Sequence, residues 1–73
     1  MLLEKARLKL VEDLSYLDDL KIVQKFLVRK DFNLLSLSMF EIQSLWFLFS
    51  DTRSASFLTV NNDTLQDFME WLD

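Results

Sequence analysis

Cysteine and histidine are both absent from this chain of 73 residues. Their absence excludes disulfide bonds and zinc sites built from Cys and His ligands. It also removes Ser/His and Cys/His nucleophile pairs and the side chain that usually exchanges protons near neutral pH. The paired carboxylates Glu12–Asp13 and Asp18–Asp19 are typical of solvated helix ends and caps. We therefore expect no enzyme, no cofactor, no metal site and no small-molecule substrate.

Glycine and proline are absent as well. Without glycine the chain has no Gly-rich phosphate-binding loop. Turns must use Asn, Asp and Ser, which tolerate turn conformations better than most residues. The candidate turn positions are Asp18–Asp19, Asn33, Ser50–Asp51 and Asn61–Asn62.

The sequence also lacks a long uncharged apolar run. A membrane span needs about 18 consecutive apolar residues. The segment that comes nearest to such a run, residues 32–50, is interrupted by Glu41, Gln43 and several serines. Residues 2 and 3 are leucines, but Glu4, Lys5 and Arg7 follow at once, which is not a signal-peptide pattern. We expect a single cytoplasmic domain over residues 1–73 that makes no contact with a membrane.

Apolar residues are plentiful, at 51% of the chain, and their spacing predicts helices. We expect helices at about 2–16, 19–30, 38–50, 51–58 and 62–72, which together form an all-α, compact bundle of four to five short helices. Ser38 and Glu41 fit a capping box, in which each side chain binds the other residue's backbone N–H. Asp18 is expected to cap the second helix, and Asn62 or Asp63 the last one. The expected core residues lie at helical spacing: Leu20, Val23, Phe26, Leu27, Ile42, Leu45, Trp46, Phe49, Leu65, Phe68, Met69 and Leu72.

The charge is unevenly distributed along the chain. Residues 1–31 carry seven Lys/Arg and six Asp/Glu, a net charge of +1, whereas residues 32–73 carry one Arg and six Asp/Glu, a net charge of −5. Proteins bind DNA largely through Lys and Arg that neutralise phosphates. The acidic second half therefore argues against direct binding to nucleic acid and favours a basic protein partner.

Residues 37–72 contain three features of one known family. Leu37–Ser38 opens a helix with Glu41 three residues after the serine, residues 51–57 are rich in Ser and Thr, and residues 62–72 close the segment with an Asn-Asp-Thr-Leu-x-x-Phe-x-x-Trp-Leu pattern. This resembles the Cro/CI-type helix-turn-helix family of phage repressors. The resemblance implies a lambda-repressor-like helix-turn-helix variant over about residues 20–72, in which residues 51–57 form the second, DNA-reading helix.

The departures from that family are informative. Family members carry a glycine at the turn, where this chain has bulky residues, and the expected second helix offers only Arg53 as a positive charge against Asp51. Its size and acidity resemble the small antirepressors of temperate phages, among them the modulators of repression of lactococcal phages. That resemblance implies a protein that binds the DNA-binding domain of a CI-type repressor, alters its binding to the operator and acts in the lysis–lysogeny switch.

Acidic side chains would then stand in for DNA phosphates, and aromatic side chains would anchor the interface. The expected partner-binding residues are Glu41, Phe47, Asp51, Arg53, Asp63, Asp67, Glu70 and Trp71. Phe47 fits the core better than the interface, whereas Trp71 lies off the apolar stripe of the last helix and fits core and interface equally. Two other functions stay open: an anti-CRISPR-like inhibitor of a host nucleic-acid enzyme, and a helix-turn-helix regulator that binds DNA itself. A structural subunit that completes a larger assembly is a further alternative.

Overall fold

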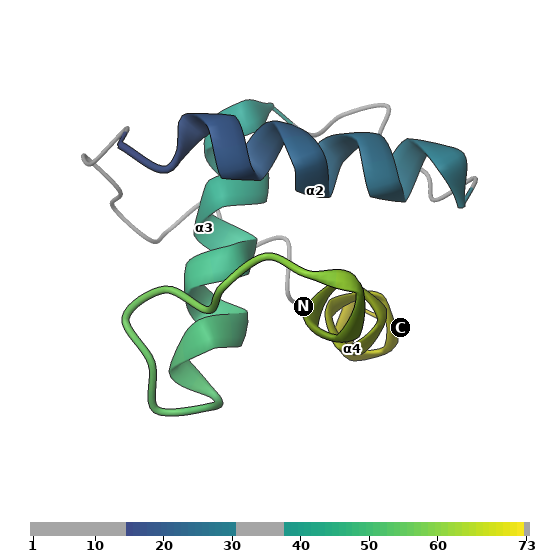
Figure 1. Ribbon diagram of the computed structural model, residues 1–73. Helices are drawn as coiled ribbons and strands as arrows, with labels where there is room; N and C mark the ends of the chain where they lie inside the picture. Colours follow the sequence, from purple (N-terminus) through teal and green to yellow (C-terminus); the bar gives the residue numbers. More distant parts are fainter. Residues whose placement is uncertain (1–14, 31–37, 73) are drawn as a thin grey trace.

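Three helices make up the part of the chain that the computed structural model describes, residues 15–30 and 38–72. They are α2 (Leu17–Arg29), α3 (Met39–Asp51) and α4 (Asn62–Leu72). Figure 1 shows α2 lying across the first half of α3 at a steep angle, while α4 lies below α2 beside the second half of α3. Each helix contacts the other two. The described residues contain no strand, so the all-α prediction is confirmed there, whereas the helix predicted at 2–16 falls mostly outside them.

Helix α2 buries the apolar stripe that its sequence predicts. Leu20, Val23 and Leu27 are fully buried and Phe26 nearly so. The predicted N-cap is wrong, because the helix begins earlier and Tyr16 occupies the N-cap position without a side-chain hydrogen bond. Asp18 lies instead in the first turn, where its charge opposes the positive end of the helix dipole.

Helix α3 is the centre of the core. Its capping box is confirmed: the backbone N–H of Glu41 donates to Oγ of Ser38 at 3.2 Å, and the N–H of Ser38 donates to Oε1 of Glu41 at 3.0 Å. Trp46 and Phe49 are fully buried. Their rings lie 5.5 Å apart, edge to face, an arrangement that aromatic pairs favour.

The helix predicted at 51–58 is wrong, because α3 ends at Asp51 and residues 52–61 form a loop. Two backbone bonds end the helix: the N–H of Ala55 donates to the carbonyl of Ser50 at 3.1 Å, and the N–H of Ser54 donates to that of Asp51 at 3.0 Å. This is the hydrogen-bond pair of a Schellman motif, which needs one residue in the left-handed region. Ser54 supplies it with a φ of 56°, in the place that glycine usually takes.

Two buried side chains of α3 then hold the loop against the helix. Nε1 of Trp46 donates to the carbonyl of Leu58 at 3.1 Å, and the N–H of Leu58 donates to Oγ of Ser50 at 2.9 Å. The Ser50 hydroxyl donates in turn to the carbonyl of Trp46 at 2.8 Å. Because both backbone groups of Leu58 are paired, the loop crosses α3 in a defined position and delivers the chain to α4.

Helix α4 is capped by Asn61 and not by the predicted Asn62 or Asp63. Oδ1 of Asn61 accepts from the N–H of Thr64 at 3.0 Å, and Oγ1 of Thr64 accepts from the N–H of Asn61 at 3.0 Å. This reciprocal pair is a capping box in which threonine replaces the usual acid. Leu65 and Phe68 are buried as predicted, while Met69 and Leu72 are half-buried against the core.

Candidate partner-binding face

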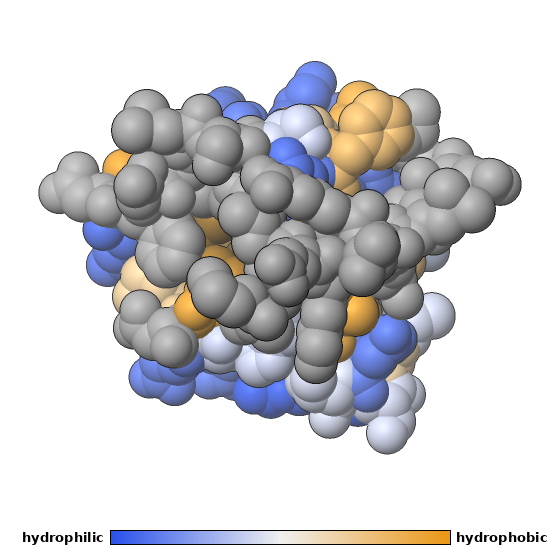
Figure 2. Space-filling view, turned by 180° about the vertical axis from the view of Figure 1, so that it is seen from behind, coloured by the Kyte–Doolittle hydropathy of each residue, from blue (hydrophilic) through white to orange (hydrophobic). Residues whose placement is uncertain are grey.

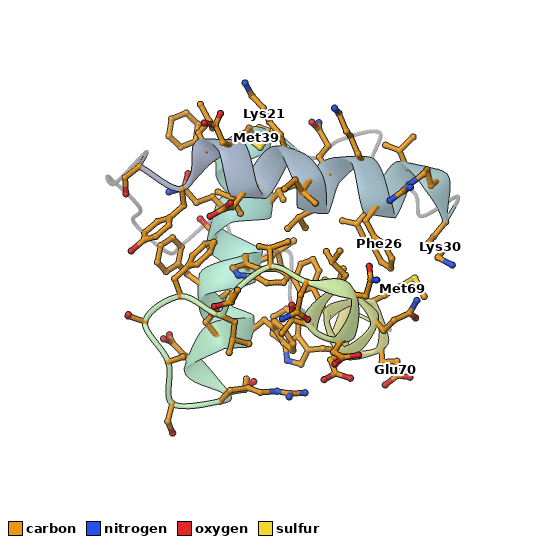
Figure 3. The ribbon with its side chains drawn as sticks, in the orientation of Figure 1. Lys21, Phe26, Lys30, Met39, Met69 and Glu70 are labelled. Carbon is orange, nitrogen blue, oxygen red and sulfur yellow. The ribbon has the colours of Figure 1, made fainter. Side chains whose placement is uncertain are left out.

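Three carboxylates form one stripe on α4: Asp63, Asp67 and Glu70, which follow each other at i, i+4 and i+7. At 100° per residue these positions lie within about 60° of one another, and the first and last are about 10.5 Å apart along the axis. The buried Leu65 and Phe68 lie on the opposite side of the helix. We call these three residues the α4 acidic stripe. Packing of the apolar face against α3 directs the stripe outward, and in Figure 3 Glu70 points down and away from the core.

One cation, Arg53, pairs with the middle of the stripe. Its Nη2 lies 3.0 Å from Oδ2 of Asp67, and its guanidinium lies over the ring of Phe49, 5.3 Å from the centroid. The two charged side chains are 46% and 38% exposed, so the pair contributes little to stability. It does fix the local charge, because three carboxylates and one guanidinium leave a net charge of −2.

Trp71 borders the stripe and packs against the core, although it was expected to lie away from the apolar face. Its ring lies 5.5 Å from that of Phe49 and is stacked 5.9 Å from that of Phe68. The side chain is half-buried, with part of the indole at the surface. Arg53 and Trp71 thus share Phe49 as a neighbour and flank the acidic stripe, so we define Asp63, Asp67, Glu70, Arg53 and Trp71 as the acidic face.

The other three predicted residues lie elsewhere. Glu41 is at the start of α3, where its carboxylate caps the helix. Asp51 ends the same helix, about 15 Å further along the axis, and is exposed two residues before Arg53. Phe47 is half-buried and packs edge-on against Tyr16 at 5.7 Å and Phe57 at 5.5 Å. The structure therefore groups five of the eight predicted residues and leaves Glu41, Phe47 and Asp51 outside that group.

Three exposed apolar residues were not singled out from the sequence: Ile22 at 49%, Val28 at 59% and Phe40 at 56% exposure. Each lies off the apolar stripe of its own helix, so helical spacing could have found them. Phe40 borders a hollow of about 150 Å³ that is also lined by Leu17, Met39 and Gln43. Ligand pockets usually measure about 300 to 1,000 Å³, so this hollow is small for a ligand site.

The surface at the level of α4 is hydrophilic. Figure 2 shows hydrophilic side chains along the lower edge of the molecule, at the level that α4 and the preceding loop occupy in Figure 1. Within residues 15–30 and 38–72, no three acidic side chains gather closely enough to hold a metal ion. In the same part of the chain, no helix has the length and apolar character that crossing a bilayer requires. Comparisons with protein-family models, curated proteins and solved structures found no significant match.

Proposed function

We propose that this protein binds a basic protein surface through the acidic face, and that its partner is the DNA-binding domain of a CI-type repressor. The observation that carries the proposal is the α4 acidic stripe, in which an intramolecular cation pairs with the middle carboxylate. Asp63 and Glu70 are exposed on either side of that pair. A partner rich in Lys and Arg would meet both carboxylates without unfolding any helix.

The mechanism is competition with DNA for one basic surface. Each DNA strand presents one phosphate per 3.4 Å or so of duplex axis, whereas the stripe presents carboxylates about 6 Å and then about 4.5 Å apart along the axis of α4. A repressor surface that neutralises several phosphates would therefore find a shorter row of negative charges on α4. Charge complementarity of this kind speeds association and selects the partner. Repressor bound by this protein would dissociate from its operator, and transcription from lytic promoters would begin in the host cytoplasm.

The proposal includes a helix-turn-helix variant that lacks the second helix. Helices α2 and α3 cross at a steep angle (Figure 1), but residues 30–38 separate them, whereas a helix-turn-helix unit joins its two helices by a turn of about three to four residues. The loop at residues 52–61 stands where the second, DNA-reading helix was expected. A variant without that helix lacks the element that helix-turn-helix proteins place in the major groove, which favours a protein partner over DNA.

The test uses the CI-type repressor whose gene lies nearest to that of this protein, together with its operator. Fluorescence anisotropy of labelled operator should fall as the protein is added to the repressor–operator complex. The double substitution Asp63→Asn and Glu70→Gln (D63N/E70Q) should shift the required concentration upward by about tenfold, because two charge pairs are lost. Asp18→Asn with Asp19→Asn changes the net charge equally on another helix and should leave the curve nearly unchanged.

The remaining outcomes discriminate between functions. Unchanged operator occupancy at excess protein would refute the antirepressor proposal. Direct binding of labelled operator by the protein alone, at physiological salt, would instead indicate a DNA-binding regulator. Inhibition of a purified host nuclease, with no effect on the repressor, would indicate an inhibitor of a nucleic-acid enzyme.

A further inference from the structure

Helix α2 carries a stripe of opposite sign on the other side of the molecule. Lys21, Lys25 and Arg29 follow each other at i, i+4 and i+8, and all three are exposed. No ion pair joins any of them to another side chain within residues 15–30 and 38–72. Lys21 points up and away from the core in Figure 3, opposite to Glu70. Asp18, one turn before Lys21, lies on the same face, so this side of α2 carries a net charge of +2, whereas α4 presents the acidic side.

The basic side also offers apolar contact area. A shallow groove of about 490 Å³ is lined by Ile22, Gln24, Lys25, Val28 and Arg29. Ile22 and Val28 are the exposed aliphatic residues of this helix. A binding surface that combines exposed apolar atoms with a rim of charge is typical of protein interfaces.

The two stripes match in length and spacing. The α2 cations extend over about 12 Å of helix axis, and the α4 carboxylates over about 10.5 Å, with neighbouring charges one helical turn apart in both. We propose that copies of this protein associate head to tail, with the α4 acidic stripe of one copy on the α2 basic stripe of the next. The inference needs no repressor and does not rest on the proposed function.

The geometry also predicts the form of the assembly. Because the two stripes face opposite directions, two copies cannot satisfy both stripes of both molecules in one closed contact. A head-to-tail contact that does not close makes an open chain. Self-association would cover the same carboxylates that bind the repressor, so it would lower the concentration of active protein when the protein is abundant.

Analytical ultracentrifugation of the purified 73-residue chain at low salt tests the contact. The average mass should rise above the monomer's 8.7 kDa with increasing concentration and should pass the dimer value without a plateau. In 1 M salt, where the Debye length is about 3 Å, the mass should return to that of the monomer. A monomer at high concentration and low salt, or association that salt leaves unchanged, would overturn the proposal.

A mixing experiment identifies the surfaces. K21Q/K25Q keeps only the acidic stripe intact, and D63N/E70Q keeps only the basic one. Each variant alone should remain monomeric, whereas an equimolar mixture should form a dimer that does not grow further. Self-association of either variant at the wild-type level, or a mixture that stays monomeric, would exclude this pair of surfaces. Circular dichroism verifies that both variants are folded.

The same variants separate this inference from the proposed function. K21Q/K25Q retains the acidic face and no longer self-associates, so it should release operator at least as well as the wild type does. Loss of operator release in K21Q/K25Q would contradict the separation of the two surfaces. If the repressor proves not to be a partner but the protein still self-associates, this inference holds and the proposed function fails.

Discussion

The guanidinium of Arg53 lies 3.0 Å from the carboxylate of Asp67 and rests over the ring of Phe49. Arg53 comes from the loop after α3 and Asp67 from the middle of α4, so this ion pair ties the loop to the acidic stripe. It also divides the stripe into a neutralised centre and two charged ends. The pair should therefore influence partner binding more strongly than it influences stability.

Arg53→Gln tests this division. The free energy of unfolding should fall by less than about 1 kcal/mol, because exposed ion pairs contribute little. Affinity for the repressor's DNA-binding domain should increase several-fold, since the uncovered carboxylate of Asp67 adds to the attraction. Urea denaturation and isothermal titration measure the two quantities.

Arg29→Gln is the matched control for Arg53→Gln, because it removes the same charge from the opposite side of the molecule. Its effect on repressor affinity should be smaller. Equal gains from both substitutions would show that net charge alone controls the affinity and that the acidic face has no special role.

Among substitutions that remove a single heavy atom, Ser50→Ala should be one of the most destabilising in this chain. The Ser50 hydroxyl accepts from the N–H of Leu58 and donates to the carbonyl of Trp46. Loss of a buried partner costs about 1 to 3 kcal/mol, and urea denaturation should show a loss of about 2 kcal/mol. Ser56→Ala, at an exposed loop position, should change stability by less than about 0.5 kcal/mol; comparable losses in both variants would refute the role of Ser50.

Ser54→Gly should stabilise the protein. Ser54 has a φ of 56°, and the left-handed conformation costs a residue with a Cβ about 1 kcal/mol relative to glycine. The expected gain is about 0.5 to 1 kcal/mol by thermal or urea denaturation. Ser56→Gly should give no gain. Destabilisation by Ser54→Gly would contradict the Schellman motif at the end of α3.

Asn61→Ala distinguishes the observed cap of α4 from the predicted one. Loss of an N-cap side chain costs about 1 kcal/mol, so this substitution should destabilise the protein by that amount. Asn62→Ala alters an exposed residue in the first turn and should cost less than about 0.5 kcal/mol. A reversed order of the two losses would place the cap at Asn62.

The sequence predicted the helices whose apolar spacing is regular. The stripe of Leu20, Val23, Phe26 and Leu27 is buried as predicted, and the Ser38–Glu41 capping box is present. Both signals depend only on residues within one or two helical turns. The three carboxylates of α4 lie opposite its buried face for the same reason, since helical geometry alone places them there.

The loop at residues 52–61 could not be predicted from the sequence, because it is held by contacts between residues far apart along the chain. Ser50 and Trp46 bind the backbone of Leu58, eight and twelve residues away, and these bonds compete with a helix at 51–58. The pairing of Arg53 with Asp67 and the packing of Trp71 on Phe49 likewise join different elements. No single-helix pattern could place those side chains together.

The central claim is that the α4 acidic stripe recognises a basic protein surface, and salt-dependent calorimetry tests it most directly. The repressor's DNA-binding domain is titrated with the wild-type protein and with D63N/E70Q, from about 50 mM to about 200 mM salt. The account predicts that wild-type affinity falls steeply with salt, while D63N/E70Q binds about tenfold more weakly at low salt and with a shallower dependence. Equal affinities and equal salt dependences for the two proteins would contradict it.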